Sequence, residues 1–128
     1  MRPGAECGRS PIERRGSLPL LKRARIEVYL PDKRERVYRR LGKAIEQEFL
    51  FTFGGCTVIR DIKGLYLNSG ERRETDKITL IYSDMPFGLS RNMMLISGYA
   101  DAVREACSEA LPEQSVLVVV QEVMHSTS

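Results

Sequence analysis

The sequence is poor in the residues that most often carry chemistry. It has a single histidine, His125, and its three cysteines, Cys7, Cys56 and Cys107, stand far apart in the chain. An odd number of cysteines without a CxxC pair is atypical of both a disulfide framework and a zinc site. We therefore expect Cys56 and Cys107 to be small apolar residues in the core, and we expect neither a metal ion nor a cofactor.

Long apolar runs are missing as well. The longest candidate covers only the five residues 116–120, whereas a membrane-spanning helix needs about 18 apolar residues or more. The first 24 residues also lack the apolar central stretch of a secretory signal. These absences predict a cytoplasmic protein without a membrane partner.

Neither of the common phosphate-binding motifs is present. The chain contains no Gly-x-x-x-x-Gly-Lys loop, and no GxGxxG follows a predicted strand. A two-histidine phosphoesterase mechanism is excluded for one chain, because residues 125–127 supply only one His-x-Thr motif. No motif therefore identifies a reaction.

The positive charge of the chain is concentrated in its first 24 residues. The net charge is +3, but residues 1–24 hold six basic and two acidic residues, and the rest of the chain holds 14 basic and 15 acidic ones. This leader also contains six of the glycines and prolines and has no apolar periodicity, so we expect it to be disordered or loosely packed. Nucleic-acid binding by the folded part is disfavoured, and weak binding through the basic leader is one alternative.

Two halves of the chain share one pattern, with an alternating strand, a helix of about five turns and a second strand in residues 26–67 and again in 78–123. The pattern predicts a βαββαβ split unit of class α+β, with a four-stranded antiparallel sheet and two helices on one face. The helices are expected from Asp32 to about Leu50 and from about Ser90 to Ala110. The strands are expected at residues 26–30, 56–67, 72–83 and 115–124, within a single domain over residues 25–126.

In the usual strand order of this topology, 4-1-3-2, one face of the sheet is left uncovered by helices. We assign to the helix side Ile26, Val28, Leu30, Ile78, Leu80 and Tyr82. This assignment leaves on the other face Glu27, Tyr29, Thr79 and Ile81, with either Leu117 and Val119 or Val116, Val118 and Val120. Both sides of the last strand are apolar, so the open face should be covered, and a second copy forming a homodimer is the simplest cover.

Four short motifs resemble a family of small bacterial domains with a ferredoxin-like fold of the dimeric α+β barrel type and no assigned function. They are residues 55–58, residues 64–66, Arg73-Glu74 followed by Lys77, and residues 113–117. The resemblance covers residues 53–126. It implies a fold and self-association, and it implies no activity.

Two residues are low-ranking candidates for catalysis. His125 could act as a general base, since imidazole is the side chain most often used for this role, although an exposed position at the end of the chain is the simpler interpretation. Glu27 shares the open face with Tyr29, and covering this carboxylate would perturb its protonation. The simpler interpretation of Glu27 is an ion pair with a neighbouring lysine such as Lys77.

Candidate ligand-binding residues are Tyr29 together with four residues of the long hairpin, Arg60, Tyr66, Arg73 and Glu74. An aromatic ring and an arginine could hold a small anion there, but cross-strand pairing on a solvated hairpin explains the same residues. We therefore expect a homodimeric binding or assembly module. The alternative is a small metabolite-directed enzyme with Glu27, Tyr66 and His125 near one cleft.

Overall fold

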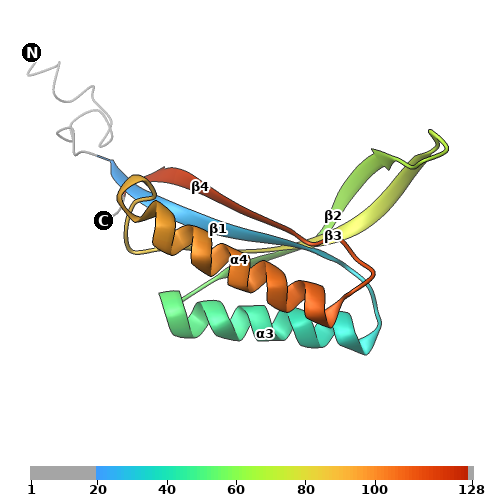
Figure 1. The fold of residues 1–128 in the computed structure, drawn as a ribbon, viewed down its shortest axis with the longest axis horizontal. Coiled ribbons are helices and arrows are strands. Elements are labelled where there is room, and N and C mark those ends of the chain that lie inside the picture. Colours follow the sequence, from blue (N-terminus) through green and yellow to red (C-terminus); the bar gives the residue numbers. More distant parts are fainter. Residues whose placement is uncertain (1–19, 127–128) are drawn as a thin grey trace, which may run out of the picture.

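The computed structural model describes residues 20–126, and the predicted βαββαβ order is confirmed (Figure 1). The four strands form one antiparallel sheet in the order β2-β3-β1-β4, as expected from the topology. The elements are β1 (Leu21–Pro31), α3 (Arg36–Phe53), β2 (Thr57–Leu67), β3 (Arg73–Asp84), the short 3-10 helix η1 (Ser90–Asn92), α4 (Met93–Ala110) and β4 (Leu117–His125).

The first strand begins five residues earlier than predicted. β1 starts at Leu21, which pairs with His125 of β4, and Ala24 is completely buried. The last four residues of the predicted leader therefore belong to the sheet. The rest of that leader, including Cys7, lies outside the described residues.

The first helix starts four residues later than its predicted cap. The backbone N–H of Asp32 donates to the carbonyl of Lys77 at 2.8 Å, so the chain still follows the sheet at this point. The carboxylate of Asp32 accepts from the backbone N–H of Asp61 at 3.3 Å instead of capping α3. The helix ends at Phe53, three residues beyond the predicted end at about Leu50, because Gly54 has φ 85° and its N–H donates to the carbonyl of Leu50.

Both helices pack on the same face of the sheet (Figure 1). Leu41, Ile45 and Phe49 recur every fourth residue on α3 and are buried. On α4 the buried residues are Ile96, Val103 and Cys107. These residues form the apolar sides of the two helices. The predicted burial of Cys107 is confirmed, whereas Cys56 is only partly buried.

The two helices also contact each other through aromatic rings and one carboxylate. The rings of Phe53 and Tyr99 lie edge to face with centroids 5.5 Å apart. The Tyr99 hydroxyl donates to Glu48 at 2.8 Å, and Thr52 donates to the same carboxylate at 2.7 Å. These two hydrogen bonds lower the pKa of Glu48.

The predicted facing of β3 is wrong. Val28 pairs with Ile81 across β1 and β3, and both are completely buried beneath the helices. Thr79 lies on this helix side, whereas Ile78, Leu80 and Tyr82 lie on the open face. Alternation favours burial of the more apolar side of β3, but the register with β1 instead places Thr79, Ile81 and Ser83 against the helices. The open face is therefore more apolar than predicted.

The hairpin of β2 and β3 extends well beyond the helices (Figure 1). A bulge between Ile59 and Ile62 interrupts the ladder of β2 and places Asp61 at φ 59°. Beyond it, a Cβ atom at Gly64 would lie 2.7 Å from Cδ1 of Ile78, so a larger residue there would displace the end of this flexible side chain. Within residues 20–126, neither helix has the length and apolar character required to span a bilayer.

Candidate functional site

The open face of the sheet is the surface that the sequence analysis singled out, and its composition changes along the strands. Residues that are opposite one another in the register share a face, so the pairs define rows across the sheet. One row runs over all four strands through Ile59, Leu80, Tyr29 and Leu117. We call these four residues the apolar row. Leu117 is 59% exposed and Ile59 is 42% exposed, so the ends of the row face solvent.

The next row contains Glu27, a carboxylate buried on a face that no helix covers. Its side chain is only 7% exposed, because neighbouring side chains of the same face shield it. The hydroxyl of Tyr29 donates to Oε1 at 2.9 Å, and Nε2 of Gln121 donates to Oε2 at 2.5 Å. Lys77, the partner considered from the sequence, instead lies 3.7 Å from Asp61. The hydrogen bond to Glu27 raises the pKa of Tyr29.

His125 belongs to an ionic cluster near the other end of the open face. Its Nε2 lies 3.0 Å from Oδ2 of Asp84, and Nε of Arg25 lies 2.6 Å from Oδ1 of the same carboxylate. The bond from Arg25, followed by the charge of Arg25 and the contact with His125, lowers the pKa of Asp84. The Arg25 guanidinium also lies 4.3 Å from the centroid of the Tyr82 ring. The cluster connects β1, β3 and β4.

The hairpin candidates form cross-strand pairs of the kind expected on a solvated hairpin. The hydroxyl of Tyr66 donates to Asp76 at 2.8 Å, and this contact raises the pKa of Tyr66 to about 12. Glu74 accepts from Nδ2 of Asn68 at 2.8 Å. Arg73 pairs in register with Leu67, at the exposed end of the hairpin.

Arg60 differs from the other hairpin candidates. It lies on the helix side of the sheet next to the bulge, where it lines a cleft together with Thr79 and residues of α3.

Glu27, Tyr66 and His125, which the enzymatic alternative places near one cleft, do not lie in one site. Tyr66 pairs with Glu74 and Glu27 pairs with Tyr82, so their rows are separated by eight residues of β3, or about 26 Å of strand. His125 is engaged with Asp84. Glu27 and Tyr29 do lie together, as expected from their alternation on one strand.

Three contributors to the open face were missed by the sequence analysis. Arg25, Asp84 and Gln121 each hydrogen-bond to a residue on a different strand. Their spacing along the chain exceeds 30 residues, and only the strand register places them side by side. Alternation on β1 signals that Arg25 shares the face of Glu27, but no local signal identifies its partner.

No family model matches the sequence, and a search of curated proteins gives no match either. Solved structures do match. CutA1 from Oryza sativa has a TM-score of 0.53 and 16% identity, over 84% of this chain and 85% of that chain. The divalent cation tolerance protein from Thermus thermophilus has a TM-score of 0.51 and 14% identity, over 84% of this chain and 88% of that chain.

A third structure, CutA from Synechococcus elongatus PCC7942 complexed with Bis-Tris, has a TM-score of 0.50 and 13% identity, over 86% of this chain and 88% of that chain. At such identities the likeness concerns the fold alone. Together with the strand order and the single layer of helices, it shows that this chain is a ferredoxin-like α+β domain.

Proposed function

We propose that the protein is a binding module that self-associates through its open sheet face, with the homodimer as the smallest assembly that covers this face. The apolar row carries the proposal. It places four large side chains side by side across the whole sheet, and Ile78 adds a further apolar side chain on the same face. Contiguous apolar patches of this kind are typical of interfaces.

The charged groups of the open face do not oppose its burial. Glu27 already accepts two hydrogen bonds, and Asp84 is paired with Arg25 and His125. A covering surface therefore does not have to supply counter-charges, which favours a second copy of the same face over a charged partner. Burying these paired groups costs less than burying unpaired ones.

The projecting hairpin provides a second apolar surface for such an assembly. Leu65 is 49% exposed and Leu67 is 67% exposed, both on the part of the hairpin that extends beyond the helices (Figure 1). Strands that extend past their own core can pack along a neighbouring copy. Leu65 and Leu67 pair with Thr75 and Arg73, on the same side of β3 as Thr79, so the hairpin is expected to add a second contact that is separate from the open face.

The experiment is a mass measurement by light scattering at micromolar concentration. The wild-type protein is expected to have a multiple of the 14.5 kDa chain mass. Leu80→Lys places a charge in the centre of the apolar row and is expected to give the single-chain mass. Leu95→Lys makes the same change at a 66% exposed position on α4 and should leave the wild-type mass unchanged. A wild-type protein that runs as a single chain contradicts the proposal.

The enzymatic alternative has no comparable support, because Glu27 and Tyr66 do not share a site. Nucleic-acid binding through the leader concerns residues outside the described part of the chain.

A further inference from the structure

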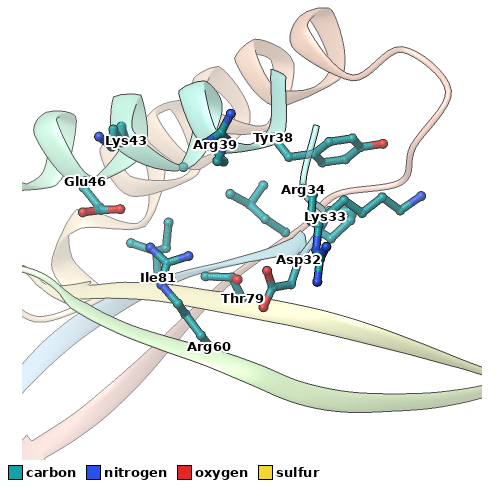
Figure 2. Close-up of a pocket in the computed structure, with 13 residues that line it drawn as sticks. Asp32, Lys33, Arg34, Tyr38, Arg39, Lys43, Glu46, Arg60, Thr79 and Ile81 are labelled. Atoms are coloured by element: carbon teal, nitrogen blue, oxygen red, sulfur yellow. The ribbon is translucent and has the colours of Figure 1, made fainter. Parts of the chain in front are cut away.

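A cleft of about 390 Å³ lies on the helix side of the sheet, opposite to the proposed assembly face. Its walls are the end of β1, the first turns of α3, and the middle of β2 and β3 (Figure 2). A volume of this size is within the range of about 300–1,000 Å³ typical of small-molecule sites.

The lining of the cleft is strongly cationic. Five basic side chains line it, from the loop before α3, from α3 itself and from the bulge of β2: Lys33, Arg34, Arg39, Lys43 and Arg60. Only two acidic residues line it, Asp32 and Glu46, so its formal charge is +3. Within residues 20–126, none of the five basic side chains lies within ion-pair distance of a carboxylate. Their charge is therefore available to a ligand.

Thr79 gives an independent indication of a ligand. Its side chain is 4% exposed, and its hydroxyl is the one buried side-chain polar atom among the described residues that has no hydrogen-bond partner. Leaving a buried hydroxyl unpaired is costly, so such atoms are rare in folded proteins. Figure 2 shows Thr79 at the base of the cleft, between Asp32 and Arg60. Because Thr79 lines the cleft, its hydroxyl can donate to a bound ligand after a small shift of the side chains around it.

The start of α3 adds positive potential to the same cleft. The helix begins at Arg36 without acidic residues in its first turn, and its N-cap residue, Glu35, makes no side-chain cap but offsets part of the helix potential. The exposed N–H groups at a helix N-terminus favour anions nearby. The helix N-terminus and the five basic side chains therefore both favour an anionic ligand.

We propose that this cleft binds a small molecule that carries phosphate groups. A phosphate offers several acceptor oxygens and up to two negative charges, which suits arginines that donate forked N–H groups and a threonine that donates one more hydrogen bond. The basic side chains are exposed at the rim and retain their water until the ligand arrives, so the empty cleft has no buried unpaired charge. Leu30 and Ile81 provide an apolar wall for the remainder of the ligand.

The test is isothermal titration calorimetry of the full-length chain with sodium pyrophosphate, in a phosphate-free buffer of low ionic strength. Binding is expected, and its affinity should decrease as salt is added. Arg60→Gln and Thr79→Val should each weaken it about tenfold, because each removes a hydrogen bond to a charged group. Arg73→Gln, which removes the same charge from the exposed end of the hairpin, should leave it unchanged.

Other anions distinguish the chemical class of the ligand. Citrate, which carries carboxylates instead of phosphates, should bind at least tenfold more weakly than pyrophosphate. Equal binding of citrate overturns the assignment to phosphate. A single-stranded oligonucleotide that binds more tightly than pyrophosphate and is weakened by Arg60→Gln would make the ligand a polymer and would also overturn the proposal.

Three further results would refute the site itself. The first is the absence of binding heat at millimolar pyrophosphate. The second is a loss of pyrophosphate affinity in Arg73→Gln as large as that in Arg60→Gln. The third is an unchanged pyrophosphate affinity in Thr79→Val. Circular dichroism and light scattering of each variant show that the fold and the mass are retained. The cleft and the open face lie on opposite sides of the sheet, so the failure of self-association would leave this test intact.

Discussion

Replacing Thr79 with valine should make the ligand-free protein more stable. The hydroxyl of Thr79 is buried on the helix side of β3 and has no hydrogen-bond partner among the described residues. Burying a hydroxyl without a partner costs about 1–3 kcal/mol in proteins. Valine has nearly the same shape and places a methyl group where the hydroxyl stood. The free energy of unfolding should therefore rise by about 1–3 kcal/mol.

The assay is thermal unfolding followed by circular dichroism, in a buffer free of phosphate and at one fixed protein concentration. The concentration must be constant because association raises the apparent stability. For a domain of about 100 residues, each change of about 1 kcal/mol shifts the midpoint by about 4–8 °C. The variant should therefore unfold at least about 4 °C above the wild type.

Thr75→Val is the matched control for this prediction. Thr75 lies on the same strand but is exposed, so the substitution tests the effect of valine in β3 without removing a buried hydroxyl. Its midpoint should change by less than that of Thr79→Val. If Thr79→Val lowers the midpoint, the hydroxyl makes a stabilising contact in the folded chain, and the reasoning from an unpaired atom is refuted.

Two other substitutions test the core and the ionic cluster. Phe49→Ala removes a completely buried ring whose centroid lies 5.9 Å from that of Phe53. Urea denaturation should show that the free energy of unfolding decreases by about 3–5 kcal/mol. A decrease below about 1 kcal/mol would contradict the packing described. Asp84→Asn should cost about 1–2 kcal/mol at neutral pH. Because the pKa of Asp84 is lowered on folding, its contribution is present above the ordinary aspartate pKa of 3.8 and is lost as the pH falls through the folded value. Denaturation curves of wild type and Asp84→Asn should converge in acid, and a difference that persists at about pH 2 would contradict this assignment.

Local patterns in the sequence were sufficient for the order of the elements. Alternation at residues 26–30 indicates a strand. Apolar residues at every fourth position, Leu41, Ile45 and Phe49, indicate a helix, and the glycine after α3 indicates its end. Each of these patterns involves only residues that are close in the sequence. The start of α3 could not be found in this way. Aspartate is a common N-cap residue, but the carboxylate of Asp32 accepts a hydrogen bond from the backbone N–H of Asp61, which is 29 residues further along the chain.

The open face was located correctly, but its residues were only partly identified. Glu27 and Tyr29 follow from alternation on one strand, whereas the facing of β3 depends on a register that pairs Val28 with Ile81. Alternation predicted burial of the more apolar side of β3, whereas pairing with β1 buries the side of Thr79, Ile81 and Ser83. The basic cleft shows the same limit: the charges of α3 are evident in the sequence, but Arg60 and Thr79 reach them only through the folded sheet.

The register of β3 has a consequence for how this chain tolerates length changes. Thr79 and Leu80 are adjacent, and one belongs to the cleft while the other belongs to the apolar row. Because successive residues of a strand point to opposite sides, a slip by a single residue would exchange the two surfaces. An insertion or deletion of one residue within β3 would therefore threaten both surfaces at once, whereas one in the turn at 68–72 can be absorbed by the loop.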